Sequence, residues 1–386
     1  MIKNNFDMLP GDHDYFMLRN GLQNCRRKFE QEKQGRVVFL GGSITYGAGW
    51  RPMVSRQLQR RFPDTRFDFI NAGIPSTGSV THAFRTRRDV FGKGDVDLVF
   101  VEAAVNDATN RPNQPDDWRR GMEGVVRCLR QVDPNIDIVM LHFADPQKIT
   151  CYDDGQIPPV IAEHEKVAEH YQLSSIHLAR EVAERIHSGQ FTWAEDFKDL
   201  HPSIYGHRLY ASSIRRLLDT AWKIRPGDTL SQLEAHTLPD PLDPLSYSRG
   251  RLVGITEAQI TQGWQIEPKW HPNSGGTRAG FVDVPMLVAG QSGAELTFKF
   301  RGTAVGLWIV AGPDVGMIDY QIDDQPIKQL DPFTQWSPHL HLPWLLILAD
   351  ELDDRQHTLL LRISTNKNEK SKGTDCRIFK FCVNGE

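Results

Sequence analysis

The stretch Arg36-Val37-Val38-Phe39-Leu40-Gly41-Gly42-Ser43-Ile44-Thr45 sets the fold class of the first part of the chain. Its first five residues form a short, largely apolar run, which predicts a buried β-strand, and the two glycines that follow predict a turn. An amphipathic helical pattern comes next, around Met53 to Arg61. A strand, a Gly-rich turn and a helix thus follow one another directly, as in an alternating α/β fold.

The same alternation continues to about residue 225. Further strands are predicted at Phe67–Ile70, Asp97–Ala103, Ile136–Phe143 and Ser174–Leu178, with helices between them and a closing helix from Ile204 to Trp222. Strands that alternate with helices form a parallel sheet that is covered on both faces, and continuous apolar strands fit that buried position. We therefore expect a first domain of α/β class over residues 1–225.

The pattern changes in the last third of the chain. Residues 226–249 are rich in Pro and Asp and contain Pro239-Asp240-Pro241, which predicts a linker or an extended arm packed across the surface. From residue 250 onward, short strand-like runs are separated by Gly, Pro and Asp turns, with almost no helical periodicity. This spacing predicts an all-β sandwich over residues 250–386.

Composition narrows the classes of function. The chain has 386 residues and a formal net charge of -4, which argues against nucleic acid as a partner because such binding needs clustered cations. The one basic run, Arg85 to Arg88, is interpreted as a solvated helix face. The five cysteines are widely spaced, which predicts free thiols rather than a disulfide scaffold or a metal site.

Two features bear on localisation. No stretch approaches the roughly 20 apolar residues that a membrane helix needs, so we expect no membrane insertion. The first thirty residues, Met1 to Glu30, lack the apolar region of a signal peptide. The sequence as given therefore predicts a cytoplasmic protein, and a secreted or periplasmic one if a leader was removed. The oligomeric state is left open.

Four segments that could carry chemistry fall at strand ends or before the last helix. They are Gly41–Thr45, Asn71–Ser79, Ala103–Asp107 and Asp196–Ser203. Each has an ordinary alternative, such as a phosphate-cradling loop, a simple turn or a helix cap. All four, however, fall in order at the edge of one predicted sheet where α/β proteins bind ligands. A serine, hydrogen-bond donors and an imidazole with a nearby carboxylate are the parts that acyl transfer requires.

These segments resemble the four sequence blocks of the SGNH (GDSL-like) hydrolase family over roughly residues 35 to 220. The resemblance implies a flavodoxin-like, three-layer α/β/α catalytic domain with Ser43 as nucleophile and His201 as general base. It also implies an oxyanion hole made by the backbone N–H of Ser43, a backbone N–H of the second block at Ser76, and the side chain of Asn106. Neither a cofactor nor a metal ion is expected.

The sequence departs from the family pattern at three positions. Ser76 stands where the second block usually has glycine, and Ala104 stands where the third block usually has it. In the last block Lys198 occupies the position expected for aspartate, and Asp199 lies only two residues before the histidine. We expect Asp199 to orient the His201 ring, with Asp196 or a backbone carbonyl as alternatives.

The tryptophans offer possible sugar contacts. Trp50 and Trp193 flank the first and last blocks and are candidate substrate-binding residues, with packing beneath the site as the alternative. Residues 302–314 resemble the jelly-roll-like β-sandwich modules that accompany carbohydrate-active SGNH esterases, which implies a carbohydrate-binding-like domain. Two interpretations, a sugar-binding platform or packing, stay open in that domain for Trp264, Trp270, Trp336 and Trp344.

The sequence thus leads to a functional hypothesis. The chain is expected to be a carbohydrate acetylesterase-like enzyme that hydrolyses small acyl esters, acetyl in particular, through an acyl-enzyme on Ser43. Its partner would be an acetylated carbohydrate. A non-catalytic glycan-binding protein on a hydrolase scaffold is the competing class, and an acyltransferase or thioesterase that uses the same serine is a further alternative.

Overall fold

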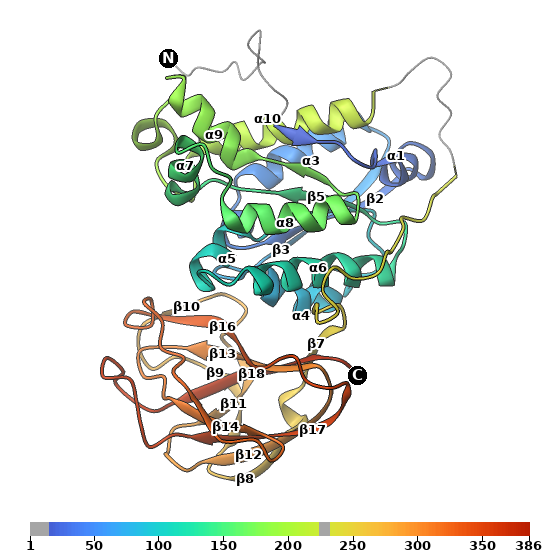
Figure 1. Cartoon of the computed structure of the whole chain (residues 1–386). Helices are drawn as coiled ribbons and strands as arrows, with labels where there is room; N and C mark the ends of the chain where they lie inside the picture. Colours follow the sequence, from blue (N-terminus) through green and yellow to red (C-terminus); the bar gives the residue numbers. More distant parts are fainter. Residues whose placement is uncertain (1–14, 224–231) are drawn as a thin grey trace. The chain divides into compact units, whose positions relative to one another are not determined.

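The computed structural model of the protein describes residues 15–223 and 232–386. The chain divides into two compact units, residues 1–246 and 247–386 (Figure 1). The first six residues of the predicted linker, 226–231, and the first fourteen residues of the chain lie outside the described residues. The assignment of the two units as catalytic and carbohydrate-binding domains stays a prediction.

The first unit is built on a six-stranded sheet in the order β1-β6-β5-β4-β2-β3. All neighbouring strands are parallel except β1, which runs antiparallel to β6. The five parallel strands have the flavodoxin-like order 2-1-3-4-5, so the predicted fold class is confirmed. The strands are β1 (Phe16–Met17), β2 (Gln34–Gly41), β3 (Arg66–Gly73), β4 (Leu98–Glu102), β5 (Asp137–Leu141) and β6 (Ser174–Ile176).

Helices cover both faces of this sheet (Figure 1). On one face α4, α6 and α8 lie side by side, and on the other α3 packs against α10. The helical elements are α1 (Gln23–Arg27), the π-helical turn η1 (Lys28–Glu32), α2 (Ser43–Tyr46), α3 (Trp50–Arg61), α4 (Ser79–Asp89), α5 (Ala104–Asn110), α6 (Pro115–Val132), α7 (Pro146–Asp153), α8 (Pro159–His170), α9 (Leu178–His187), the π-helical turn η2 (Trp193–Phe197) and α10 (Ile204–Ala221).

The basic run on α4 is not a solvated face, which corrects the expectation from sequence. Arg87 and Arg88 are exposed, but Arg85 is fully buried against the sheet. Its guanidinium donates hydrogen bonds to backbone carbonyls and forms an ion pair with Asp89 at 2.8 Å. A buried arginine needs such partners because an unpaired charge away from water is costly.

Residues 232–246 of the predicted linker belong to the first unit, where they run along it without regular secondary structure. Arg130 Nη1 donates to the Thr237 carbonyl at 2.8 Å, and the Glu123 carboxylate accepts the backbone N–H groups of Leu242 and Asp243. These bonds satisfy backbone groups that an irregular segment would otherwise leave to water. The segment is therefore an extended arm, which was the second of the two alternatives.

The second unit consists of two antiparallel-rich sheets that face each other. One has the order β10-β16-β13-β18-β11-β9, with β7 also paired to β18, and the other has the order β15-β14-β17-β12-β8. Phe298 of β12 stacks on Phe381 of β18 with ring centroids 4.1 Å apart, so the core lies between the sheets. The predicted all-β sandwich is confirmed.

The elements of this unit follow one another from residue 250. They are β7 (Gly250–Val253), the 3-10 turn η3 (Ile255–Glu257), β8 (Gln259–Gln262), β9 (Gln265–Trp270), β10 (Gly276–Thr277), β11 (Val284–Ala289), β12 (Glu295–Gly302), β13 (Ala304–Ala311), β14 (Ile318–Ile322), β15 (Lys328–Leu330), β16 (Leu340–Ala349), β17 (Arg355–Ile363) and β18 (Cys376–Asn384). All five cysteines of the chain are free, and all but Cys151 are buried.

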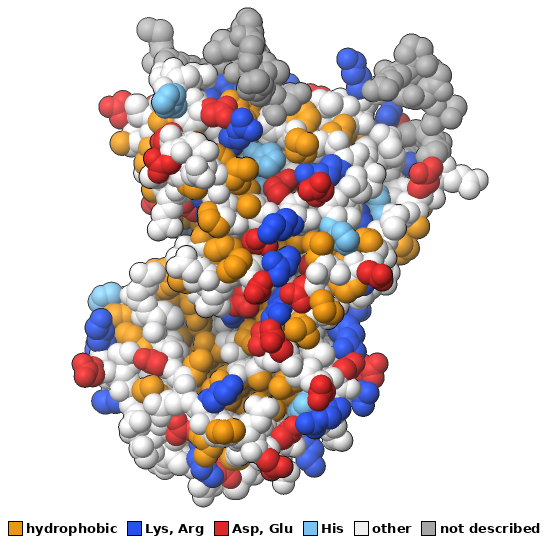
Figure 2. Space-filling view, in the orientation of Figure 1, with side chains coloured by type: hydrophobic (Ala, Val, Ile, Leu, Met, Phe, Trp, Pro, Cys, Tyr) orange, Lys and Arg blue, Asp and Glu red, His pale blue; other side chains and the backbone are white. Residues whose placement is uncertain are grey.

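The surface mixes both signs of charge. On the face shown in Figure 2, Lys and Arg side chains lie among Asp and Glu side chains. Arg119 pairs with Glu163 at 2.9 Å and Arg120 with Asp243 at 2.8 Å in the first unit, so several cations already have an acidic partner. In the part of the chain that the structure describes, no helix combines the length and the apolar character that crossing a membrane demands.

Candidate active site

The three strands β2, β3 and β4 deliver the first three candidate segments to one edge of the sheet. Because these strands are parallel neighbours, their carboxyl ends lie at the same edge. β2 lies between β3 and β4, so the order in which the chain adds strands to the sheet reverses at β2. This is the position where open α/β sheets bind ligands. Ser43, the first residue of α2, follows the end of β2 after a single glycine.

Ser43 and His201 meet at this edge. The Oγ atom of Ser43 and the Nε2 atom of His201 lie 2.7 Å apart, although 158 residues separate them in the sequence. Ser43 is half-buried and His201 is exposed. A hydroxyl within hydrogen-bonding distance of an imidazole nitrogen is the arrangement that general-base activation of a serine requires.

The loop that carries His201 is fixed at both ends. Ser203 caps α10, its Oγ accepting the backbone N–H of Tyr205 at 3.1 Å, and its own N–H donates to the Phe197 carbonyl at 2.9 Å. Upstream, Lys198 has a left-handed φ of 79°, so the chain turns sharply between η2 and the histidine. The capped helix and this turn together hold the imidazole over the end of β2.

The third member of a triad is not formed by a direct contact. Across the described ranges, 15–223 and 232–386, no hydrogen bond joins either Asp199 or Asp196 to His201. Asp199 is exposed, and the Asp196 carboxylate accepts the backbone N–H of Thr192 at 2.9 Å. The role of Asp199 in orienting the ring therefore stays a prediction, with Asp196 already engaged in its own turn.

Asn106 lies against the loop that carries the nucleophile. A Cβ atom on Gly42 would collide with Asn106 Oδ1, so the glycine is what lets the amide approach the backbone beside Ser43. The backbone N–H of Ser43 belongs to the first turn of α2, where N–H groups have no acceptor within the helix. Two of the expected oxyanion donors, the Ser43 N–H and the Asn106 side chain, thus belong to or lie against the Gly42–Ser43 turn.

Ser76 takes the conformation that glycine would usually provide. Its φ is 67°, in the left-handed region, which costs a residue with a side chain about 1 kcal/mol. The Ser76 carbonyl accepts a hydrogen bond from Asn110 Nδ2 at 3.0 Å, and Asn110 is the last residue of α5, the helix that also contains Asn106. Helix α5 therefore holds the second and third segments together.

Asp107 has a structural role that no sequence pattern indicated. Its buried carboxylate accepts the backbone N–H of Ser79 at 2.8 Å and lies 3.0 Å from Nε2 of His164. A Cβ atom on Gly78 would collide with this carboxylate. The contact anchors the start of α4 to α5 and α8, because a carboxylate is favourable at a helix N-terminus.

Arg51 secures the nucleophile turn from the other side, and no sequence signal pointed to it. Its guanidinium donates to the carbonyls of Thr45, Tyr46 and Gly47, the last two at 2.9 and 3.0 Å. The carbonyls of Thr45 and Tyr46 lie in the last turn of α2, where no N–H group of the helix donates to them, and Gly47 is the residue after the helix. Burial lowers the pKa of Arg51 from its usual value. The short helix that presents Ser43 is thereby capped by a single side chain.

The two tryptophans near the site differ from each other. Trp50 is fully buried, and its ring packs edge-on against Phe39 and Phe143 in the core between the sheet and α3. Its interpretation as a substrate-binding residue is wrong, and the packing alternative holds. Trp193 is half-buried and stacks on Phe197 with centroids 4.8 Å apart, so a sugar contact there stays a prediction.

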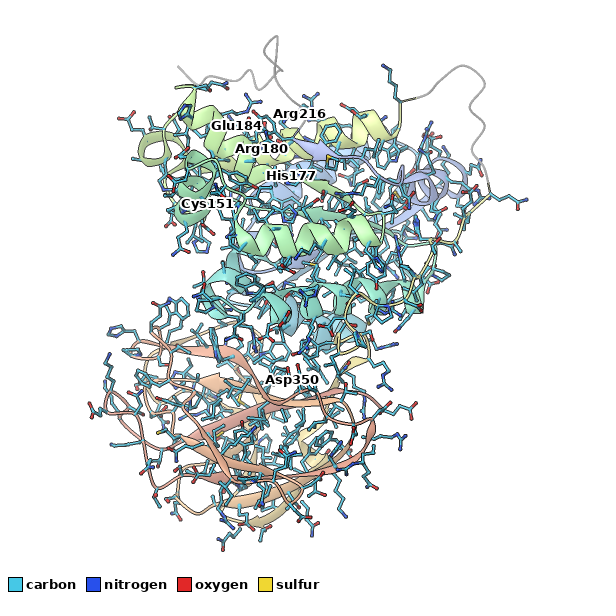
Figure 3. The ribbon with its side chains drawn as sticks, viewed as in Figure 1. Cys151, His177, Arg180, Glu184, Arg216 and Asp350 are labelled. Carbon is cyan, nitrogen blue, oxygen red and sulfur yellow. The ribbon has the colours of Figure 1, made fainter. Side chains whose placement is uncertain are left out.

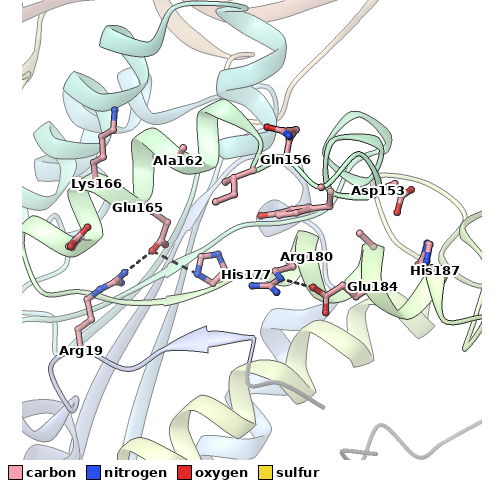
Figure 4. Close-up of a pocket in the computed structure, with 15 residues that line it drawn as sticks. Arg19, Asp153, Gln156, Ala162, Glu165, Lys166, His177, Arg180, Glu184 and His187 are labelled. Carbon is pink, nitrogen blue, oxygen red and sulfur yellow. Dashed lines mark hydrogen bonds and ion pairs between the residues drawn. The ribbon is translucent and has the colours of Figure 1, made fainter. Parts of the chain in front are cut away.

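A cavity of about 730 Å³ in the same unit lies away from Ser43, among α7, α8 and α9 (Figures 3 and 4). Glu165 is its central charged group. One carboxylate oxygen accepts from His142 Nε2 at 2.8 Å, and the other accepts from Arg19 Nη2 at 2.8 Å. His177 Nε2 lies 3.8 Å from the second oxygen. The ligand atoms of His142, Glu165 and His177 lie close enough together to hold a cation. Both carboxylate oxygens of Glu165, however, already have a partner in the fold.

Burial sets the protonation of this cluster. Desolvation, followed by the charge of His142, lowers the pKa of His177 to about 4. Desolvation also lowers the pKa of His142. Burial opposes ionisation of Glu165, but the hydrogen bond and charge of His142 and the neighbouring cations hold its pKa well below the usual range. At neutral pH the cluster is therefore a carboxylate between two neutral imidazoles and one arginine.

Comparisons with known proteins agree with this fold. The model of the GDSL-like Lipase/Acylhydrolase family matches residues 39–209. A comparison with curated protein sequences finds no match. A two-domain esterase (CEX) active on acetylated mannans, co-crystallised with mannopentaose, superposes with a TM-score of 0.74 at 19% identity, over 95% of each chain. A second structure of a two-domain esterase (CEX) active on acetylated mannans gives the same TM-score and identity, covering 95% of this chain and 96% of that one.

Proposed function

Since residues 39–209 form a domain of the GDSL-like lipase/acylhydrolase family, we propose that this protein is a serine esterase that removes small acyl groups, acetyl in particular, from a carbohydrate. The observation that carries the proposal is the 2.7 Å approach of Ser43 Oγ to His201 Nε2. Asn106 supports it, because its side-chain amide lies against Gly42, the residue before Ser43. Together they provide the nucleophile, the base and an oxyanion donor of an acyl-transfer site.

The proposed reaction has two displacements. His201 accepts the Ser43 proton as the hydroxyl oxygen attacks the ester carbonyl carbon, and the carbonyl oxygen becomes an oxyanion. The backbone N–H groups of Ser43 and Ser76 and the amide of Asn106 donate to it. The C–O bond to the sugar then breaks as the imidazolium gives its proton to the departing sugar oxygen, which leaves as a hydroxyl group. Water repeats the sequence on the acyl-enzyme and releases the acid.

The carbohydrate substrate rests on two further observations. The whole chain shares its two-part fold with an esterase active on acetylated mannans. In the β-sandwich, Trp264 and Trp270 are buried and serve packing, but Trp336 and Trp344 are half-buried, with ring centroids 5.9 Å apart. Flat aromatic rings can stack on sugar rings, so we assign glycan binding to this pair.

Substitution of the nucleophile tests the proposal. Ser43→Ala removes the attacking oxygen and is expected to abolish hydrolysis of p-nitrophenyl acetate and acetate release from acetylated mannan and xylan. Ser55→Ala on α3 is the matched control, because the Ser55 hydroxyl only bonds the Arg51 carbonyl of its own helix. Equal activity of the Ser43 variant and the wild type would remove Ser43 from the mechanism.

One observation favours a second candidate. Within the described part of the chain neither Asp196 nor Asp199 is bonded to His201, as would be true of a scaffold that has lost its catalytic carboxylate. Such a protein would bind glycan without hydrolysing it. Retention of acetylated polysaccharide by wild-type protein that releases no acetate, and transfers no acyl group to a sugar or thiol acceptor, would support this alternative.

A further inference from the structure

Helix α4 carries two fully buried polar side chains that the proposed reaction does not use. Arg85 Nη1 donates to the Ala72 carbonyl at 2.8 Å, and Nη2 donates to the Gly41 carbonyl at 3.1 Å. Ala72 lies near the end of β3, and Gly41 is the last residue of β2. One guanidinium group therefore joins the carboxyl ends of the two strands that lead to Ser76 and Ser43.

The second side chain extends the connection to a third strand. His82 Nε2 lies 3.1 Å from the carbonyl of Glu102, the last residue of β4. A carbonyl can only accept, so Nε2 carries the proton, and the unprotonated Nδ1 accepts from Arg85 Nη2 at 3.1 Å. This chain of donors fixes a neutral imidazole tautomer. Burial, followed by the charge of Arg85, keeps the pKa of His82 well below its usual value, consistent with that state.

The three carbonyls stand just before the three expected oxyanion donors. Gly41 precedes Ser43 by two residues, Ala72 precedes Ser76 by four, and Glu102 precedes Asn106 by four. We propose that His82 and Arg85, the α4 clamp, are positioning residues that set the spacing of these donors by holding the ends of β2, β3 and β4 together. The inference rests on the proposed function, because it assigns a task to the same site.

The geometry favours positioning over simple neutralisation of charge. Asp89, at 2.8 Å from Arg85 Nη1, balances the cation, yet both terminal nitrogens of Arg85 also reach strand carbonyls. The Gly41 carbonyl also accepts the backbone N–H of Ile74 at 3.0 Å, so Arg85 adds a side-chain bond where the ladder between β2 and β3 ends. Two linked side chains that together join three strand ends limit the relative movement of these ends. Oxyanion donors act only when they are preorganised around the developing charge.

Arg85→Met tests the clamp, because methionine fills similar volume without donors. Thr86→Val is the matched control on the same buried helix, since the Thr86 hydroxyl only bonds the His82 carbonyl at 2.7 Å. For p-nitrophenyl acetate, we expect Arg85→Met to lower kcat by about 10²-fold with little change in KM, the cost of a small misplacement of catalytic groups. Arg85→Lys, which keeps a cation and a donor, should recover part of kcat.

Hydrogen–deuterium exchange of the same proteins gives a readout that needs no activity. We expect faster exchange in Arg85→Met at residues 41–46, 72–79 and 102–107, and none of this change in Thr86→Val. Should Arg85→Met fail to fold, His82→Leu gives the same comparison and leaves the ion pair of Arg85 with Asp89 in place.

The outcomes separate the clamp from the proposed function. Lower kcat together with faster exchange at the three segments supports the inference. A folded variant with reduced stability but unchanged kcat and unchanged exchange there would overturn it, leaving α4 a purely structural role. If the wild type hydrolyses no ester, the proposed function fails, and the exchange arm alone decides whether the three strand ends depend on His82 and Arg85.

Discussion

At the scale of single residues, the candidate site depends on short polar contacts between segments far apart in the chain. Ser43 and His201 are brought to 2.7 Å by the end of β2 and by the capped start of α10. Gly42 leaves room for Asn106 because it has no side chain, and Ser76 adopts a left-handed φ that its turn requires. Each of these features can be altered separately.

Asn106 is the proposed side-chain donor of the oxyanion hole, and its loss should raise the free energy of the transition state alone. We expect Asn106→Ala to lower kcat for p-nitrophenyl acetate by about 10²–10³-fold with KM nearly unchanged, because an oxyanion donor acts on charge that develops during attack. Thr109→Ala, on the same helix, removes only a hydroxyl bonded to the Val105 carbonyl and should leave kcat unaltered. Equal kcat in both variants would mean that Asn106 donates nothing to the oxyanion.

Ser76 should serve through its backbone rather than its hydroxyl. Ser76→Gly keeps the N–H and removes the cost of a left-handed φ of 67°, and Ser76→Ala keeps the N–H alone. We expect both variants to retain kcat within about threefold, since the donor is the peptide group. Steady-state kinetics on the two proteins checks this. A large loss of kcat in both would assign the donor role to the hydroxyl.

At the scale of secondary-structure elements, the ends of β2, β3 and β4 are held by neighbouring helices. Arg51 caps α2, Asp107 anchors the start of α4, and Asn110 of α5 bonds the carbonyl of Ser76. The helices therefore do more than cover the sheet, because their polar side chains fix the loops that carry the site. Away from Ser43, Glu165 of α8 likewise contacts His142, which follows β5, and His177, which follows β6.

The cluster of His142, Glu165 and His177 predicts acid-sensitive stability. The pKa of His177 is about 4 in the fold and about 6.5 in the unfolded chain, so the unfolded state binds more protons between these values. The free energy of unfolding should therefore fall as the pH drops from about 6.5 to about 4, by roughly 3 kcal/mol from this residue. Calorimetry at pH 7 and pH 5 should show a smaller fall in melting temperature for His177→Asn than for the wild type. An identical pH dependence in the two proteins would contradict the assignment of this acid sensitivity to His177.

The elements predicted from sequence are those with a strong local signal. The five parallel strands were predicted because buried strands leave continuous apolar runs, whereas the two-residue β1 leaves none and exists only through its pairing with β6. The α10 helix was predicted to within one residue of its end, because its apolar periodicity is sustained and Ser203 caps it.

The side-chain environments were harder to predict than the elements. Arg85 was assigned to a solvated face because arginine is rarely buried, and only the distant carbonyls of Gly41 and Ala72 make its burial possible. Trp50 was misplaced because a tryptophan beside a site can face the ligand or the core. The partner of the His201 ring depends on the path of one loop, which the spacing of Asp199 does not determine.

At the scale of the whole molecule, the chain combines an α/β unit with a β-sandwich, each with its own core. Together they match, over 95% of the chain, the fold of an esterase active on acetylated mannans. Under the proposed function the first unit hydrolyses the ester and the second retains the polysaccharide. The two tasks can be measured separately, because under this proposal the hydrolysis of a small soluble ester requires only the first unit.

Substitution of Trp336 tests whether the second unit retains the polysaccharide. We expect Trp336→Ala to weaken retention of the protein by acetylated mannan in affinity electrophoresis by about fivefold or more, since one stacking contact is lost. The kcat for p-nitrophenyl acetate should not change. Trp308→Phe is a core substitution in the same sandwich and serves as the control, because Trp308 is fully buried. Unchanged retention by the Trp336 variant would contradict a sugar contact at this residue.

The most direct measurement is the identification of the covalent intermediate. Protein quenched in acid during turnover of p-nitrophenyl acetate can be digested and its peptides analysed by mass spectrometry. The proposed mechanism requires an acetyl group on Ser43 in the wild type, a larger acetylated fraction when deacylation is slowed, and none at this position in Ser43→Ala. Turnover with acetyl groups only on other residues, or undiminished turnover by Ser43→Ala, would contradict it.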